Sequence, residues 1–249
     1  MASAWDKNWQ RLPLEGVVNA RELGGFPTRS GAETQWHRFV RSDALTRATS
    51  DDVEFLRNYG VRAVLDLRGE DEAAKDPDVF LGDDVAYANI SLFDINIADY
   101  EAARKKYPDG KFHASSVYDA MFENADAVRA CMEFIADAPE GCVLFHCVVG
   151  KDRTGVLAAL LMLLAGCDRW DVLASYVPSR VNLLRSDVFS SVWARDCDDV
   201  EREHYDSLPA TLEHWLGRLE GECGSVIAYL ERCGVSYETM SAVRSRLLA

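Results

Sequence analysis

The sequence predicts an α/β fold in which a central, mainly parallel sheet is flanked by helices. Short apolar runs at residues 61–67, 85–92 and 143–145 are typical of buried strands. Segments of helical periodicity lie between and after these runs, so strands and helices alternate along the chain. Residues 146–155 separate two apolar runs and indicate a strand, a tight loop and a helix in direct succession.

Each expected element has its own local signal. Residues 36–42 predict a short strand, and residues 49–59 predict a helix that Ser50 can cap and Gly60 ends. Residues 156–165 are apolar throughout, as expected of a helix buried on all sides. The other helices are expected at residues 98–107, 115–137, 153–165, 224–234 and 236–248. Residues 170–220 lack a convincing strand pattern and are expected to form either a helical insertion beside the site or a solvated helical face.

Length and composition fit a single domain over residues 1–249, because 48% of the residues are hydrophobic and 27% are charged. The formal net charge of -14 argues against a nucleic-acid partner and against binding to anionic membranes. The longest apolar run has ten residues, whereas a membrane-spanning helix needs about 20. No integral membrane association is therefore expected, and the pattern leaves the oligomeric state open.

Cysteine usage suggests a reducing compartment. The chain has 7 cysteines, an odd number, and none form a Cys-x-x-Cys pair. Neither a disulfide framework nor a zinc site is expected, and the first residues lack an apolar signal core. We therefore expect a cytoplasmic protein without a metal or other cofactor, although export without an obvious signal stays open.

The motif His-Cys-Val-Val-Gly-Lys-Asp-Arg-Thr-Gly, residues 146–155, predicts an anion cradle around a nucleophile. Cys147 ends a strand and faces the backbone N–H groups at the start of a helix, which favour negative charge. Arg153 carries a planar fork that can hold two phosphate oxygens. Gly150 permits a tight turn, and Thr154 can donate its hydroxyl to the cysteine sulfur.

This chemistry predicts hydrolysis of phosphomonoesters. The Cys147 thiolate would attack phosphorus to give a phosphocysteine, which water then hydrolyses, while Arg153 and the loop N–H groups stabilise the transferred phosphoryl group. The leaving oxygen needs a proton from a carboxylic acid. Asp66, at the end of a strand, is one candidate for this acid, and Asp94 and Asp119 are weaker ones.

The motif resembles the signature of the cysteine-dependent protein tyrosine phosphatase superfamily. Its inner residues, Gly150 to Arg153, resemble those of the bacterial and fungal tyrosine/serine phosphatases that also act on phosphoinositides. Three further segments are similar to that family: Asn-Ala-Arg-Glu-Leu-Gly-Gly at 19–25, Arg-Ser-Asp-Ala-Leu at 41–45 and Val-Leu-Asp-Leu-Arg at 64–68. The resemblance covers nearly the whole chain and implies a tyrosine-phosphatase-like fold with a helical lid at about residues 181–220.

The resemblance also implies roles for individual residues. It makes Asp152 the leading general acid, with Asp66 second, and places Lys151 where it could meet a second phosphate of a lipid headgroup. Val148, Val149 and Gly150 would line the substrate pocket. The sequence Ser-Tyr-Val-Pro-Ser-Arg at 175–180 stands where the family has Tyr-x-x-Ser-Asn, so the role of that asparagine is in doubt.

Several of the remaining charged residues have two interpretations. Asp66 and Arg68 either contact substrate or form an ion pair that braces the loop. Asn19 and Arg21 are expected to hold the turn at Gly24, and two more charged residues, Arg41 and Asp43, are expected to pair with each other.

The sequence therefore predicts a cysteine-dependent phosphatase acting on phosphotyrosine, with phosphoserine, phosphothreonine and phosphoinositides as further substrates. The alternatives are a dedicated phosphoinositide or inositol-phosphate phosphatase and an inactive phosphate-binding module. The intact Cys147, Asp152 and Arg153 argue against the inactive module. Sulfur transfer also uses a cysteine loop, but the Arg-Thr-Gly end of this motif does not favour it.

Overall fold

The computed structural model describes residues 3–93, 113–185 and 209–248. At its centre lies a five-stranded sheet with the strand order β1-β2-β5-β3-β4. The strands are β1 (Arg21–Glu22), β2 (Phe39–Ser42), β3 (Val61–Asp66), β4 (Ala86–Asn89) and β5 (Cys142–His146). Strands β2, β5, β3 and β4 run parallel, whereas β1 pairs antiparallel with β2. The predicted mainly parallel sheet is confirmed.

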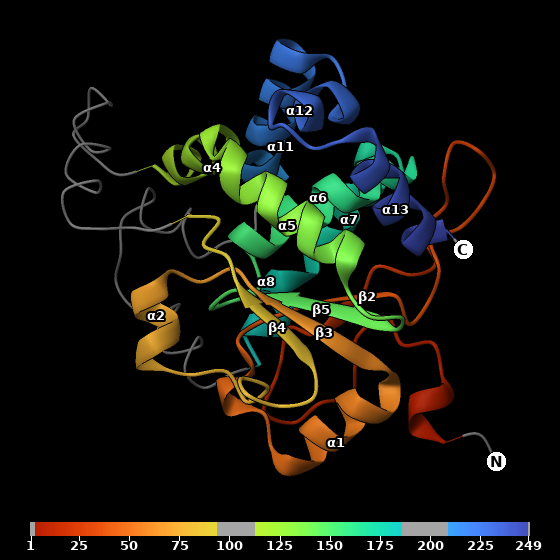
Figure 1. Cartoon of the computed structure of the whole chain (residues 1–249), viewed down its shortest axis with the longest axis vertical. Coiled ribbons are helices and arrows are strands. Elements are labelled where there is room, and N and C mark those ends of the chain that lie inside the picture. Colours follow the sequence, from red (N-terminus) through yellow and green to blue (C-terminus); the bar gives the residue numbers. More distant parts are fainter. Residues whose placement is uncertain (1–2, 94–112, 186–208, 249) are drawn as a thin grey trace.

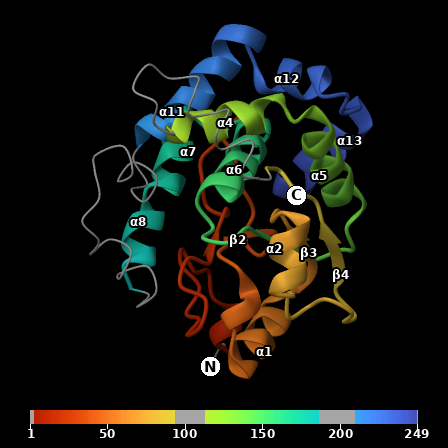
Figure 2. The ribbon, with the colours of Figure 1, turned by 90° about the vertical axis from the view of Figure 1, so that its left-hand side faces the viewer.

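Helices cover both faces of this sheet (Figures 1 and 2). The helices are α1 (Ser50–Tyr59), α2 (Glu70–Lys75), α4 (Ala114–Glu123), α5 (Ala125–Asp137), α6 (Asp152–Ala165), α7 (Arg169–Tyr176), α8 (Pro178–Leu183), α11 (Pro209–Arg218), α12 (Val226–Arg232) and α13 (Tyr237–Leu248). Helices α4, α5, α6, α11, α12 and α13 lie on one side, and α1 lies on the other.

Alternating side chains of the central strand divide the core into two clusters. Val143 and Phe145 of β5 pack against the larger helical layer, whereas Cys142 and Leu144 pack on the side of α1. This alternation is the two-residue period of a strand with both faces buried. Helix α6 lies within the larger cluster, and its residues from Thr154 to Met162 are all buried, which confirms the expected all-round burial.

The boundaries of several elements differ from those expected. Thr49, rather than Ser50, caps α1, since its hydroxyl accepts a hydrogen bond from the backbone N–H of Asp52 at 3.1 Å. Strand β2 starts at Phe39, after His37 adopts a left-handed backbone with φ of 62°. The elements predicted from the sequence do not include β1 or α2.

The expected long helix at residues 115–137 is two helices. Asn124 lies between α4 and α5, and its side chain accepts a hydrogen bond from the N–H of Ala127 at 3.3 Å. The asparagine therefore ends one helix and caps the next, a preference that periodicity alone does not register. The helix expected at 98–107 lies outside the described residues.

The region expected to form a helical insertion is described only in part. Helix α8 ends at Leu183, α11 begins at Pro209, and residues 186–208 lie outside the described ranges. Trp215 of α11 is fully buried and contacts the rings of Phe122 and Tyr229 edge-on. This part of the expected insertion is thus anchored in the helical core.

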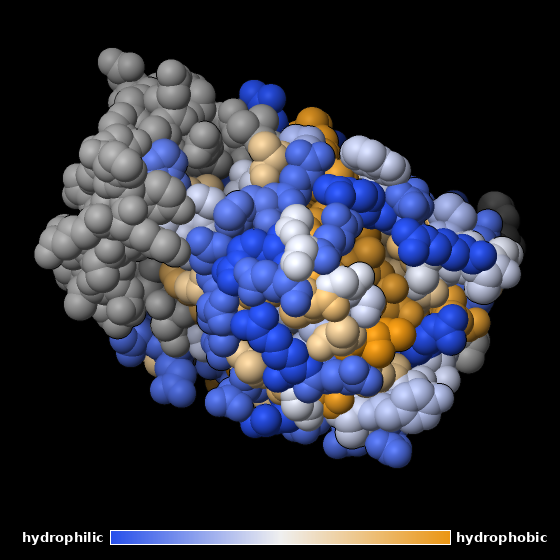
Figure 3. Space-filling view, turned by 90° about the horizontal axis from the view of Figure 1, so that it is seen from above, coloured by the Kyte–Doolittle hydropathy of each residue, from blue (hydrophilic) through white to orange (hydrophobic). Residues whose placement is uncertain are grey.

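Seen from above, charged and polar side chains are spread over the helical layer, with apolar areas between them (Figure 3). Among the described helices, none is long and apolar enough to cross a membrane.

The register brings four strand ends to one edge of the sheet. Ser42 of β2 and Asp66 of β3 both lie opposite His146 of β5, and Asn89 of β4 lies opposite Asp66. The segments that follow these strands therefore leave the sheet side by side. Ligand sites in open parallel sheets form at this edge.

Candidate active site

The loop from Cys147 to Lys151 connects β5 to α6, as the motif predicted. Gly150 has φ of 70°, and a Cβ atom there would lie 2.4 Å from the carbonyl oxygen of Ser42. Only glycine fits this close crossing of the loop over the end of β2. The N–H of Ala44 donates to the carbonyl oxygen of Val148 at 3.0 Å and fixes the outer part of the loop.

Cys147 lies at the base of this loop with 1% of its surface exposed. The Thr154 hydroxyl lies 3.2 Å from its Sγ atom, so the predicted contact between hydroxyl and sulfur is present. Thr154 is held in the first turn of α6, whose N-terminus faces the loop. This end of the helix favours an anion such as a thiolate or a bound phosphate. His146 lies beneath, with Nδ1 3.2 Å from the carbonyl oxygen of Cys147.

Arg153 extends from the start of α6 to α2. Its guanidinium forms an ion pair with the carboxylate of Glu72, and its Nη1 lies 3.4 Å from the carbonyl oxygen of Phe93. Burial lowers the pKa of Arg153, but the negative charges of Cys147 and Glu72 outweigh it and hold the pKa above its ordinary value. The ion pair with Glu72 therefore keeps the guanidinium of Arg153 charged beside the loop. Glu72 was not among the site residues predicted from the sequence.

Asp152 accepts a hydrogen bond from the buried Tyr118 hydroxyl, whose oxygen is 2.8 Å from Oδ1. Tyr176 extends this chain, because its hydroxyl lies 2.9 Å from that of Tyr118. The Lys151 ammonium is 3.6 Å from the same Oδ1, and Lys151 is 3% exposed. Lys151 thus lies inside the protein beside Asp152, and its predicted contact with a second phosphate stays a prediction.

A network of buried polar groups supports the loop from below. The side-chain amide of Asn19 donates to the carbonyl oxygen of Val149 at 2.8 Å, and Asn182 donates to Oδ1 of Asn19 at 3.2 Å. Arg41 donates to the carbonyl oxygens of Gly150 and Lys151 at 3.2 and 3.4 Å. Burial lowers the pKa of Arg41 to about 10. This network holds the loop backbone in one shape.

These contacts correct two expectations. Asn19 supports the active-site loop itself, rather than the turn at Gly24. Arg41 donates to backbone carbonyls, while Asp43 accepts the N–H groups of Val18 and Asn19 at 3.1 and 2.9 Å, so Arg41 and Asp43 serve different partners. Asn182, two positions beyond the segment that departs from the family pattern, supplies an asparagine to the loop support.

Asp66 and Arg68 form an ion pair beside the loop. Their side chains are 0% and 2% exposed, and Nη2 of Arg68 lies 2.7 Å from Oδ2 of Asp66. Tyr87 also donates to Oδ2 at 2.9 Å. Burial raises the pKa of Asp66, but the hydrogen bonds from Arg68 outweigh it and hold the pKa below its ordinary value. A carboxylate that is kept ionised in this way suits bracing rather than proton donation.

Of the two weaker acid candidates, the described one lies away from the loop. Asp119 binds His214 at 2.8 Å and Arg218 at 3.0 Å on the helical layer. Asp94 lies outside the described residues. Within the described ranges, no group of three or more His, Cys, Asp or Glu residues could hold a metal ion.

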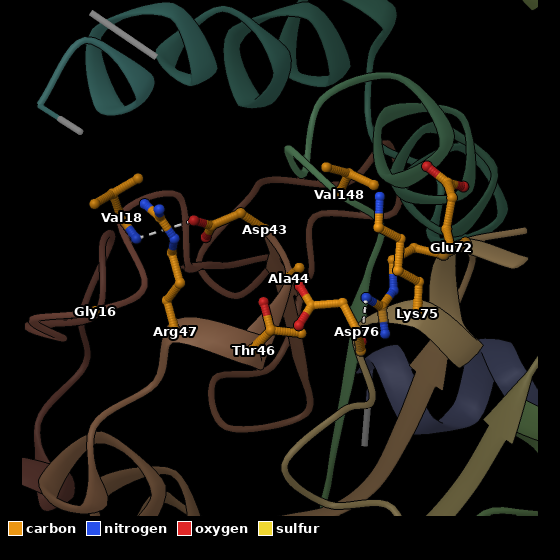
Figure 4. A pocket seen from close by; sticks show the side chains of 11 residues that line it. Gly16, Val18, Asp43, Ala44, Thr46, Arg47, Glu72, Lys75, Asp76 and Val148 are labelled. Carbon is orange, nitrogen blue, oxygen red and sulfur yellow. Dashed lines mark hydrogen bonds between the residues drawn. The ribbon is translucent and has the colours of Figure 1, made fainter. Parts of the chain in front are cut away.

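A cleft of about 540 Å³ adjoins the loop (Figure 4). Val148, which follows Cys147 directly, forms part of its wall. The cleft is lined by Gly16, Val18, Asp43, Ala44, Thr46, Arg47, Arg68, Glu72, Lys75, Asp76 and Val148. It lies between the segment after β2 and helix α2, so it extends the site away from the cysteine along the sheet edge.

Comparison with known proteins decides the family. The model of a family described as the tyrosine phosphatase family matches residues 12–249. The chain belongs to the tyrosine phosphatase family. A tyrosine-protein phosphatase of Nostoc commune is 30% identical to this phosphatase, and the match covers 84% of this chain and 74% of the relative.

A second relative is the triple specificity protein phosphatase PtpB of Mycobacterium tuberculosis. It is 26% identical, and the match covers 94% of this phosphatase and 98% of the relative. Among solved structures, TpbA of P. aeruginosa is 16% identical with a TM-score of 0.31, over 66% of this chain and 89% of that one.

Proposed function

We propose that this phosphatase hydrolyses phosphotyrosine in proteins through a phosphocysteine formed on Cys147. The observation that carries the proposal is the contact of 3.2 Å between the Thr154 hydroxyl and Sγ of Cys147, inside a loop that faces the start of α6. A hydroxyl that donates to sulfur stabilises a thiolate, both before it attacks phosphorus and when it leaves.

The first step breaks the bond between phosphorus and the tyrosine oxygen. The Cys147 thiolate forms a bond to phosphorus, while Arg153 and the loop N–H groups bind the phosphoryl oxygens. Asp152 donates its proton to the departing phenol oxygen. In the second step the Asp152 carboxylate takes a proton from water, which attacks phosphorus and releases inorganic phosphate and the thiolate.

The exposed part of the Asp152 side chain supports its role as the acid, although the two donors on its other oxygen favour the carboxylate form. Tyr118 and Lys151 both approach Oδ1. Oδ2 has no hydrogen bond to any residue of the described ranges, and 29% of the side chain is exposed. We infer that Oδ2 carries the proton that is transferred.

Leaving-group dependence tests this assignment. The variant Asp152→Asn should lose about 10²-fold or more of the turnover of alkyl phosphates, because a poor leaving group needs the proton. Turnover of p-nitrophenyl phosphate should fall far less. An equal loss on both substrates would contradict the acid role.

Cys147→Ser tests the nucleophile. Phosphate release should vanish on every substrate, whereas rapid quenching of the parent enzyme with labelled p-nitrophenyl phosphate should trap a phosphorylated protein. Phosphate release that persists in Cys147→Ser would contradict the phosphocysteine mechanism.

Activity on phosphoserine and phosphothreonine is a second candidate, supported by the name of the mycobacterial relative. Phosphoinositide hydrolysis has weaker support, since Lys151 pairs with Asp152 inside the protein. A panel of phosphopeptides and phosphorylated inositol lipids ranks the three substrate classes by kcat/KM.

A further inference from the structure

His146, the residue before Cys147, has oxygen atoms of other residues beside both of its ring nitrogens. Nδ1 lies 3.2 Å from the carbonyl oxygen of Cys147 and 3.9 Å from Oδ1 of Asp66. Nε2 lies 3.1 Å from Oδ2 of Asp78. A carbonyl oxygen or an ionised carboxylate can only accept a hydrogen bond, so a ring nitrogen that faces one needs a proton. These contacts therefore fit an imidazolium, which carries a proton on each nitrogen.

The charges around His146 favour the same form. Asp66, Arg68, Asp78 and His146 are all buried. The Arg68 guanidinium pairs with Asp66, to which Tyr87 of β4 also donates. Among the described residues, this leaves Asp78 without a cation unless the imidazole is protonated. A buried carboxylate without a partner is costly, whereas an imidazolium balances the charge of the four side chains.

Asp78 is held in place by the turn that it begins between α2 and β4. Its Oδ1 accepts the N–H of Phe80 at 2.9 Å, and Phe80 is fully buried in the core cluster on the side of α1. Within the described ranges Oδ2 has no hydrogen bond, and its polar contact is the one with Nε2 of His146. The turn thus uses one oxygen of the carboxylate and leaves the other for the imidazole.

The proton on Nδ1 of His146 sets the orientation of the first peptide group of the loop. In a planar trans peptide, the carbonyl of Cys147 and the N–H of Val148 point in opposite directions. Because the Cys147 carbonyl oxygen is held toward His146, the N–H of Val148 is turned away from the imidazole. This N–H is one of the loop donors that would bind a phosphoryl oxygen.

We propose that Asp78 is a positioning residue for the active-site loop and that it acts through His146. The Asp78 carboxylate keeps the imidazole protonated on both nitrogens, and Nδ1 then holds the peptide group between Cys147 and Val148 in the orientation that binds phosphate. The inference rests on the proposed function, because it assigns Asp78 a part in binding phosphate at that site.

The protonation of the His146 ring can be tested in the parent protein without measuring activity. The chain has 5 histidines, and nuclear magnetic resonance distinguishes the ring of His146 through its backbone resonances. At neutral pH, both ring nitrogens of His146 should show the signals of an imidazolium. In Asp78→Asn, whose side-chain amide can donate to Nε2, the ring should become a neutral tautomer. A neutral His146 ring in the parent protein would overturn the proposal.

Phosphate binding tests the positioning role. In Asp78→Asn, the inhibition constant of inorganic phosphate and the KM for p-nitrophenyl phosphate should both rise about 10-fold, because the loop N–H is held less firmly. The kcat should fall by less than about 3-fold, since a bound substrate still meets Cys147 and Arg153. If Asp78 serves the turn alone, thermal stability falls while both constants stay at their parent values, and the proposal is wrong.

Asp168→Asn is the matched control. Asp168 accepts the N–H of Trp170, two residues further on, at 3.0 Å, just as Asp78 accepts that of Phe80. It lies at the start of α7 and contacts no histidine among the described residues. Its inhibition constant for phosphate should therefore equal that of the parent enzyme, and an equal rise in both variants would count against Asp78.

Two further outcomes separate this inference from the proposed function. If the parent protein hydrolyses no p-nitrophenyl phosphate, the proposed function fails. Calorimetric binding of inorganic phosphate to the parent and to Asp78→Asn then decides the role of Asp78, and equal affinities would refute it. If Asp78→Asn does not fold, the ring signals of His146 in the parent protein decide the proposal.

Discussion

Tyr118 connects the acidic residue of the loop to the interior of the helical layer. It is 1% exposed, donates to Asp152 and contacts the hydroxyl of Tyr176. Burial and the neighbouring Asp152 carboxylate raise the pKa of Tyr118 well above its ordinary value, so the phenol stays a donor. A donor held on Oδ1 fixes the rotation of the carboxyl group and so orients Oδ2, the atom that we propose carries the proton.

Removal of this donor should impair proton transfer more than phosphate binding. Tyr118→Phe should lower kcat for alkyl phosphates about 10-fold and change kcat for aryl phosphates by less than about 2-fold, because the acid is no longer oriented. Steady-state kinetics on the two substrate classes measure the ratio.

Tyr229→Phe is the matched control, since it also removes a buried tyrosine hydroxyl, one that donates to the carbonyl oxygen of Phe122 at 2.9 Å. An unchanged ratio of alkyl to aryl turnover in Tyr118→Phe would show that Tyr118 only supports the fold.

At the scale of elements, α2 positions Arg153, the arginine that we propose binds phosphate. The helix has six residues, and its Glu72 also accepts the backbone N–H of Gly69 at 2.8 Å, which fixes the carboxylate at the start of the helix. Arg153 on α6 is thereby joined to a segment that follows β3. An arginine that is held before substrate arrives loses less side-chain entropy on binding phosphate.

Glu72→Gln should lower kcat/KM for p-nitrophenyl phosphate about 10-fold, mainly through KM, because Arg153 is no longer held. The free energy of unfolding should change by less than about 1 kcal/mol, since the pair is partly exposed. Glu70→Gln, on the same helix and without a described partner, should behave like the parent enzyme. An equal KM for Glu72→Gln and Glu70→Gln would refute the positioning role of Glu72.

The sequence predicted the parts of this site that rest on a local motif. Cys147, Gly150, Arg153 and Thr154 lie within eight residues, so their strand, loop and helix could be inferred together. Glu72 and Tyr118 could not be found in this way, because an acidic helix and a tyrosine on an amphipathic helix are common. Their roles depend on tertiary contacts between distant segments.

The same limit applies to the fold. The mainly parallel sheet and the buried α6 followed from apolar runs, whereas the capping roles of Thr49 and Asn124 came from local side-chain hydrogen bonds. Strand β1 has two residues, and no periodicity can be read from so short a segment.

At the scale of the whole molecule, Glu22 joins three segments of the chain. Its carboxylate accepts hydrogen bonds from the N–H groups of His37 and Gly24 and from the Tyr59 hydroxyl, at 2.8, 3.2 and 2.7 Å. Burial raises the pKa of Glu22 to about 7, from an ordinary value of 4.5, although these hydrogen bonds oppose the shift. Glu22 therefore couples the stability of the fold to pH.

The sign of this coupling follows from the raised pKa. Between about pH 4.5 and pH 7, the folded protein keeps a proton on Glu22 that the unfolded chain has lost. The contribution is fully present below about pH 4.5 and is lost as the pH rises through 7. The free energy of unfolding should fall by up to about 3 kcal/mol over this range.

Urea unfolding at several pH values measures this fall. In Glu22→Gln, the free energy of unfolding should not show this fall with pH, whatever the absolute stability of the variant. In Glu231→Gln, a substitution at an exposed position, the fall should be the same as in the parent enzyme. Parallel pH profiles for Glu22→Gln and the parent enzyme would contradict the coupling.

The hydrogen bonds beneath the active-site loop also determine how early the loop can form while the chain is being synthesised. Asn19 is 131 residues from Gly150 and 163 residues from Asn182, both of which it contacts. A nascent chain that has already exposed Cys147 and Arg153 still lacks Asn182, which emerges seconds later at ~5–20 residues per second. The enzyme thus stays without its supported loop until most of the chain has left the exit tunnel, which delays the onset of activity during synthesis.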